Sequence, residues 1–92
     1  MPHYFYFARC SDGSLYAGYT NDLEKREAAH NNGKGAKYTA GRAPVRIIYS
    51  ETFESKGDAL RREAEVKKWT KKKKEYLLVQ ADLQKMDTER NN

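Results

Sequence analysis

Cysteine and proline are scarce in this sequence: its 92 residues contain one cysteine, Cys10, and two prolines. A single cysteine excludes an internal disulfide and favours a reducing compartment. Together with His3 and His30, it also supplies too few ligands at suitable spacing for a zinc site. We therefore expect Cys10 to pack within a strand, as a small apolar side chain does.

Long apolar segments are missing as well. No run approaches the ~20 residues that a helix needs to cross a bilayer. The N-terminus also lacks the charged-then-apolar layout of a signal peptide. We expect a cytoplasmic protein with no membrane contact.

Positive charge and tyrosine are abundant. Eighteen Lys and Arg residues against thirteen Asp and Glu give a net charge of +5 and a pI near 9.4. This balance favours a polyanionic partner, although an ordinary basic surface would explain it equally well. Seven tyrosines and three phenylalanines supply large faces for burial, so we expect one folded domain.

The N-terminal third predicts a hairpin followed by a helix. Two aromatic, strand-like runs, residues 4–10 and 15–19, flank an Asp-Gly pair, which is typical of a hairpin. Asn21 with Glu24 three residues later resembles a capping box. The helix is expected over residues 22–31, ending at Gly33.

The remaining chain predicts a long loop, a strand and two helices. The loop covers residues 31–44 and the β-branched strand residues 45–49. One helix is expected to start near Ser55 or Asp58 and continue to about Trp69. Thr70 caps the next, over residues 71–85, whose apolar stripe comprises Tyr76, Leu77, Val79, Leu83 and Met86.

The predicted order is therefore β-β-α-β-α-α. The economical arrangement is an α+β fold, in which helices flank a three-stranded, largely antiparallel sheet. We assign residues 3–80 to this domain and residues 81–92 to a helix end and a frayed tail.

Glu63 is the first candidate for chemistry. Its spacing from Ala59, Leu60 and Val66 places the carboxylate on the apolar stripe of its helix. A charge there needs a partner, a metal or a proton. The alternative is a glutamate at the stripe edge that pairs with Lys67, four residues on.

Arg26 and His30 form a second candidate pair, four residues apart on the first helix. Leu23, the clearest apolar anchor of that helix, lies on the same side, so both side chains should lean toward the sheet. A guanidinium beside an imidazole suits phosphate recognition. Alternatively, they are a surface arginine and a histidine that the helix dipole favours.

Four tyrosines lie on the hairpin, and cross-strand packing alone would account for them. A phenol can also act as a general base if positive charge lowers its usual pKa of about 10. Tyr6 and Tyr16 point to the same face of the hairpin only if the residue numbers of directly opposite residues add up to an even number. A two-residue turn at Asp12 and Gly13 would pair Ser11 with Ser14, whose numbers add up to an odd number. We therefore predict an odd-length loop or a bulge near Gly13.

The long loop carries three cations, Lys34, Lys37 and Arg42. The loop lacks the residue order of a P-loop, so we reject that type of nucleotide binding. We expect it instead to contact a nucleic acid backbone. Lys71 to Lys74 are expected to be a solvated helix face.

The order of these features resembles that of the GIY-YIG nuclease superfamily. The resemblance rests on Tyr4-Phe5-Tyr6, Tyr16-Ala17-Gly18, Arg26, His30 and Glu63. The segments SDGSLYAGYTNDLEKR, HNNGKGAKYT and ALRREAEVKKW are similar to small single-domain bacterial proteins of an uncharacterised family. The Slx-type nuclease domain and, more remotely, the N-terminal nuclease domain of the repair excinuclease share these features. The first motif lacks its leading glycine here, and alanine replaces the usual isoleucine in the second.

The resemblance implies a role for each matched residue. Tyr6 and Tyr16 are the alternative general bases, Arg26 and His30 stabilise the phosphate, and Glu63 is the metal ligand. The implied cofactor is a divalent cation, Mg²⁺ with Mn²⁺ as the alternative, and the implied reaction is endonuclease-type phosphodiester hydrolysis in DNA repair or processing. DNA is favoured over RNA as the substrate.

Two other functions remain open at this point. The chain could be a nucleic-acid-binding module with a vestigial nuclease site, or an interaction subunit that joins a protein partner in a repair complex. The sequence does not indicate the oligomeric state.

Overall fold

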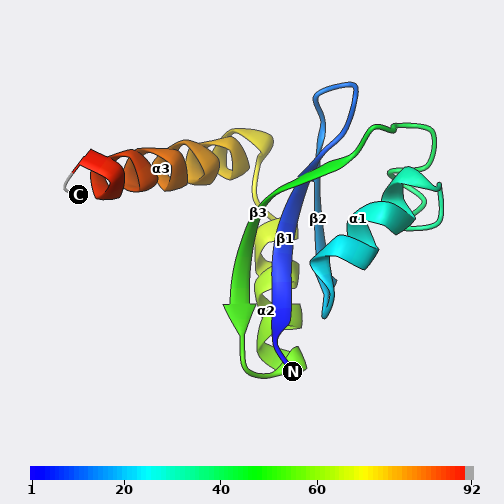
Figure 1. The fold of residues 1–92 in the computed structure, drawn as a ribbon, viewed down its shortest axis with the longest axis horizontal. Coiled ribbons are helices and arrows are strands. Elements are labelled where there is room, and N and C mark those ends of the chain that lie inside the picture. The colour runs from blue at the N-terminus through cyan, green and yellow to red at the C-terminus, as the bar shows by residue number, and fades with distance from the viewer. Residues whose placement is uncertain (91–92) are drawn as a thin grey trace.

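A computed structural model describes residues 1–90, with side chains placed through Met86. The elements follow the order β-β-α-β-α-α, as predicted (Figure 1). Their bounds are β1 His3–Arg9, β2 Leu15–Thr20, α1 Leu23–Asn31, β3 Arg46–Phe53, α2 Lys56–Lys67 and α3 Lys71–Arg90. Within these residues, no helix is both long and apolar enough to span a membrane.

The three strands form one antiparallel sheet in the order β2-β1-β3. Tyr6 lies opposite Gly18 and Ala8 opposite Tyr16, so opposite residues sum to an even number. The turn achieves this with three residues between Cys10 and Ser14, whose backbone groups are bonded at 2.9 Å. Gly13 occupies the left-handed position of this turn at φ 83°. The predicted odd-length loop is confirmed, and Tyr6 and Tyr16 project from the same face.

The third strand was predicted too short. It continues four residues beyond Tyr49, to Phe53, and pairs with β1 along this whole length. Exposed and half-buried side chains alternate along it. A bulge opposite Phe7 and Ala8 shifts the register, so Tyr49 and Phe53 pack in one buried cluster and Ile47 in the other. The polar residues that ended the predicted strand lie in this regular alternation.

Side chains from both faces of β1 are buried in two separate clusters. Phe5 and Phe7 pack against Val66 of α2 and Leu78 of α3. On the opposite face, Tyr6 and Ala8 belong to a second cluster, to which Leu23, Val45 and Ile47 also contribute. Helices α2 and α1 thus cover opposite faces of the sheet (Figure 1).

Side-chain caps fix where the first two helices begin. Asp22, rather than the predicted Asn21, caps α1 and accepts a bond from the Lys25 amide at 3.1 Å. Aspartate satisfies this free amide as well as asparagine would, so the sequence offered two equivalent caps. Ser55 caps α2 at the start that Ser55 and Asp58 were predicted to mark, accepting from the Asp58 amide at 3.1 Å.

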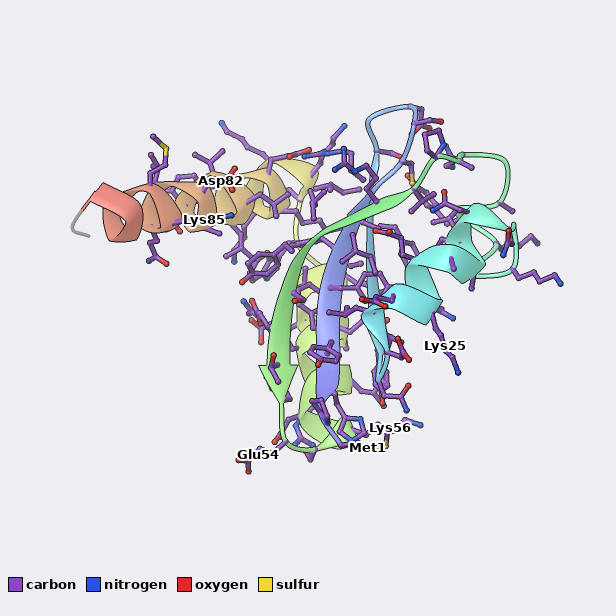
Figure 2. The ribbon with its side chains drawn as sticks, in the orientation of Figure 1. Met1, Lys25, Glu54, Lys56, Asp82 and Lys85 are labelled. Carbon is purple, nitrogen blue, oxygen red and sulfur yellow. The ribbon has the colours of Figure 1, made fainter. Side chains whose placement is uncertain are left out.

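Helix α3 differs most from expectation. Only its first half packs on the protein, through Leu77, Leu78 and an Arg9–Glu75 ion pair of 2.6 Å. The second half projects away from the sheet, where Figure 2 shows Asp82 and Lys85 on it. The predicted stripe is consequently more than half exposed at Tyr76, Val79, Leu83 and Met86.

The helix also continues to Arg90, so most of the predicted frayed tail is helical; the expected fraying of residues 91–92 lies outside the described residues. Helical periodicity predicted the stripe, but it could not predict that no other element of residues 1–90 would cover it.

Candidate active site

Four of the predicted site residues meet on the α1 side of the sheet. The Tyr6 hydroxyl of β1 lies 2.6 Å from Nε2 of His30 and 3.2 Å from Nε of Arg26, both on α1. The ring of Tyr16 on β2 has its centroid 6.3 Å from that of Tyr6 and 5.2 Å from that of His30. The spacing of Arg26 and His30 therefore does place both side chains against the sheet.

A buried chain of hydrogen bonds runs through this cluster. Thr39 donates its hydroxyl proton to the Ala36 carbonyl at 3.1 Å, so the Thr39 oxygen must accept from Nδ1 of His30, 2.7 Å away. His30 then has Nε2 free to accept the Tyr6 proton, and the Tyr6 oxygen accepts from Arg26. With a neutral imidazole, each donor and acceptor in this chain of hydrogen bonds therefore has a partner.

Burial also sets the protonation of these groups. Desolvation lowers the pKa of His30 below its usual value, and the nearby Arg26 charge lowers it further. Desolvation raises the pKa of Tyr6 to about 12, although Arg26 acts in the opposite direction. Near neutral pH, Tyr6 is therefore a neutral phenol that donates to a neutral His30.

Gly18 leaves the space that the two tyrosines occupy. A Cβ atom at this position would lie 2.5 Å from the Tyr6 hydroxyl oxygen and 2.8 Å from the Tyr16 ring. Its φ does not require glycine, so close approach of the rings is what demands the missing side chain.

Tyr6 and Tyr16 differ in accessibility. Tyr6 is fully buried, whereas Tyr16 is half-buried and lines a surface cleft of about 280 Å³. A water or phosphate that enters from solvent would thus meet Tyr16 before Tyr6.

Glu63 approaches the cluster from α2. Its side chain is only 19% exposed and pairs with Lys67, with 3.3 Å between Oε2 and Nζ. Its negative charge reaches Tyr6, whose pKa it helps to raise. The pairing with Lys67 that we considered as an alternative is therefore present, and Nζ of Lys67 in turn lies 5.6 Å from the centroid of the Tyr16 ring.

The donor set suits a cation that takes few protein ligands. Among residues 1–86, whose side chains the structure describes, no three His, Cys, Asp or Glu side chains gather into a multi-ligand site. Mg²⁺ commonly binds through one or two carboxylates and completes its shell with water and phosphate oxygens. Glu63, a carboxylate that is 19% exposed beside Lys67, could supply one such ligand.

The three cations of the long loop are placed differently from one another. Lys34 and Lys37 are exposed to solvent. Arg42 is bonded to Asp12 at 2.6 Å and lies 4.4 Å from the Tyr38 ring centroid, so part of its charge is already balanced. The two lysines are thus better placed than Arg42 to meet a phosphate backbone.

Two polar residues that the sequence did not single out hold this loop in place. Thr39 is fully buried and bonds to His30. Asn31 forms two bonds with Val45, its Nδ2 donating to the carbonyl at 2.8 Å and its Oδ1 accepting from the amide at 2.6 Å. Residue type gives no signal for Thr39, and Asn31 has the character of an ordinary helix end.

Comparison with known proteins identifies the family of this chain. The family model described as "GIY-YIG catalytic domain" matches residues 2–76. A "UPF0213 protein" of Bacillus pumilus is 52% identical over 86 residues, which cover 94% of this chain and 88% of the relative. The "UPF0213 protein YazA" of Bacillus subtilis is 56% identical over 76 residues, covering 83% and 77%.

Two solved structures are similar in sequence and in fold. The solution NMR structure of protein EF2693 from E. faecalis is 48% identical, with a TM-score of 0.61 over 90% of this chain and 88% of that one. For the UPF0213 protein BH0048 from Bacillus halodurans, the identity is 49% and the TM-score 0.56, over 86% and 84%. With the family model spanning most of its length, the chain belongs to the GIY-YIG nuclease family.

Proposed function

We propose that this protein is a metal-dependent endonuclease that hydrolyses phosphodiester bonds in nucleic acid, with DNA as its substrate and a role in DNA processing or repair. The observation that carries the proposal is the convergence of Tyr6, Tyr16, Arg26, His30 and Glu63 from four separate elements. Packing alone does not require a guanidinium, a neutral imidazole and a carboxylate around two phenols.

Glu63 would hold the divalent cation, with Mg²⁺ proposed and Mn²⁺ as the alternative. Bound there, the cation would supply Lewis-acid stabilisation of the phosphate and the leaving oxygen. The carboxylate is only 19% exposed, and its Oε2 lies 3.3 Å from Nζ of Lys67.

The protein side chains divide the remaining work. Arg26 holds its guanidinium in place by donating Nε–H to Tyr6, so its other N–H groups can bind phosphate oxygens. Tyr16 is the tyrosine that solvent reaches, and we assign it the task of orienting the attacking water and, in its ionised form, accepting a proton from that water. Tyr6 and His30, both fully buried, act as positioning residues for Arg26 and Tyr16.

Cleavage of labelled single-stranded, duplex and branched DNA with Mg²⁺ or Mn²⁺ tests the proposal. Wild-type protein should cut only with metal, and Glu63→Gln should abolish cutting while leaving the fold intact. Glu65→Gln is the matched control, because Glu65 lies on the same helix and pairs with Arg62 in an exposed contact.

The alternative functions predict different results. Salt-dependent binding without cutting, unchanged by Glu63→Gln, would favour a nucleic-acid-binding module. Cutting that survives Glu63→Gln would place the metal elsewhere and contradict the proposed site.

A further inference from the structure

The cleft beside Tyr16 lies between four parts of the chain. Its lining comes from β2, the long loop, α2 and the start of α3, and consists of Leu15, Tyr16, Ala17, Tyr38, Lys67 and Lys74. Its volume, about 280 Å³, is at the lower end for small-ligand sites. Because Tyr16 and the partner of Glu63 both line it, the cleft opens directly onto the proposed active site.

Tyr38 gives the cleft an aromatic wall that its neighbours hold in place and that remains partly exposed. Its ring stacks on that of Tyr16 at 25° and 6.1 Å, and Arg42 lies 4.4 Å from its centroid. Arg42 is itself held by Asp12. The Tyr38 side chain nevertheless remains 44% exposed. A ring that only packed the protein would be buried, whereas an oriented and exposed ring suits a stacked ligand.

Two lysines give the cleft positive charge, and Nζ of Lys67 lies 5.6 Å from the centroid of the Tyr16 ring. Lys67 shares its charge with Glu63, while Lys74 has no carboxylate partner among the residues that the structure describes. One positive charge at the cleft is thus uncompensated. An aromatic wall with lysines beside it is the combination that binds nucleotides of single strands, whose bases stack and whose phosphates pair with cations.

We infer that this cleft binds one unpaired nucleotide next to the bond that is cut. Its base would lie against the Tyr16–Tyr38 wall and its phosphate near Lys74. A base inside a duplex has neighbours on both faces and cannot reach such a wall without leaving the stack. The preferred substrate is therefore DNA with a single-stranded segment at the scissile position. This inference rests on the proposed nuclease function for the location of that bond.

Binding can be measured apart from catalysis. In EDTA, where metal-dependent cutting cannot occur, the full chain is titrated into a single-stranded oligonucleotide containing the fluorescent base 2-aminopurine, and into the same strand annealed to its complement. The wild-type protein should bind the single strand more tightly and quench its fluorescence. Tyr38→Leu should weaken single-strand binding about tenfold and remove the quenching, while leaving duplex binding unchanged.

Controls separate stacking from loss of structure. Tyr38→Phe should bind like wild type, since it keeps the ring, and an unchanged melting temperature of Tyr38→Leu shows that the loop stays folded. Tyr76→Leu changes another exposed tyrosine outside this cleft and should have no effect. Lys74→Gln should reduce the salt dependence of single-strand binding by about 0.7 in log–log slope, and Lys85→Gln should not.

Equal weakening of single-strand and duplex binding by Tyr38→Leu, or an absence of quenching by the wild type, would overturn the inference. Binding that meets all expectations in a protein that never cuts DNA would refute the nuclease proposal and leave the nucleotide cleft standing. Metal-dependent cutting by a protein whose single-strand binding is unaffected by Tyr38→Leu and Lys74→Gln would support the nuclease proposal and refute the nucleotide cleft.

Discussion

The hydroxyl oxygen of Tyr6 and Nε2 of His30 lie 2.6 Å apart inside the protein, although 24 positions separate them in the chain. Both side chains are fully buried. Their bond joins β1 to α1 and, through Thr39, extends to the long loop. The groups that support the site and the loop that flanks it are thus parts of one hydrogen-bonded unit.

Mild acid should destabilise the protein through His30. The folded state holds the pKa of this imidazole below about 6.5, its unfolded value, so the unfolded chain binds a proton first as the pH falls. The free energy of unfolding should therefore decrease between pH 7 and 5, by at most about 1.4 kcal/mol per pH unit. Urea unfolding at several pH values measures it.

Two variants test whether His30 causes this pH dependence. His30→Gln should be less stable at pH 7 but lose the slope between pH 7 and 5, whereas His3→Gln should keep it. Measurements stay above pH 5, because arginine partners and hydrogen bonds lower the pKa of Asp12, Asp58 and Glu75, which contribute in stronger acid. A wild-type stability that is flat over this range would refute a neutral, buried His30.

Gly18→Ala should damage both fold and activity. The added methyl overlaps the Tyr6 hydroxyl and the Tyr16 ring, so one of the rings must move. Overpacking of this kind costs about 1–3 kcal/mol. Calorimetry should show a lower melting temperature, and cleavage should fall with it.

Gly57→Ala is the matched control for that change. Gly57 lies in α2, and its Cβ would meet nothing nearer than Arg61 at 3.6 Å. Replacing a helical glycine should stabilise the protein by about 0.5–1 kcal/mol. If Gly18→Ala were also as stable as the wild type, the two tyrosine rings could not pack against Gly18 as closely as the structure places them.

Arg26→Lys should not preserve activity, although it preserves charge. Lysine cannot bond to Tyr6 through Nε and present further planar N–H groups to a phosphate. We expect kcat to fall about 10²–10³-fold with a smaller change in KM, since the lost contacts stabilise developing charge. Arg61→Lys, on an exposed ion pair with Asp58, should leave both constants unchanged. Full activity of Arg26→Lys would show that a point charge suffices.

Asn31→Asp should loosen the end of the long loop. A carboxylate can still accept from the Val45 amide, but it repels the Val45 carbonyl to which the amide group now donates. The cost should be about 1–3 kcal/mol. Hydrogen exchange at the Val45 amide should accelerate in this variant and stay slow in Asn21→Asp. Unchanged exchange would mean that other contacts hold the loop.

Local chemistry made much of the fold predictable. The Asp-Gly turn, the side-chain caps and the β-branched run predicted the element order. For Tyr6 and Tyr16 to share a face, the hairpin loop had to contain an odd number of residues, and the observed loop does, with Gly13 in its left-handed position. The end of β3 and the course of α3 were not predictable in this way. Both depend on what packs alongside, which residue type does not encode.

The residues of the candidate site were predictable from the sequence, but their arrangement was not. Helical spacing and the family resemblance indicated Arg26, His30 and Glu63. Neither could show that His30 would be fully buried behind Tyr6, or that the Thr39 hydroxyl would accept the hydrogen bond from Nδ1 of His30. These contacts join segments far apart in the chain, so they follow from the tertiary structure alone.

That wide separation along the chain has a consequence during synthesis. A ribosome releases Tyr6, Tyr16, Arg26 and His30 well before Glu63 and the rest of α2. Until α2 closes over the sheet, a nascent chain holds the phosphate-facing residues without the one carboxylate that would anchor the metal. Under the proposed function, cutting activity therefore begins only after Glu63 has emerged, and translation products truncated before α2 do not cut DNA.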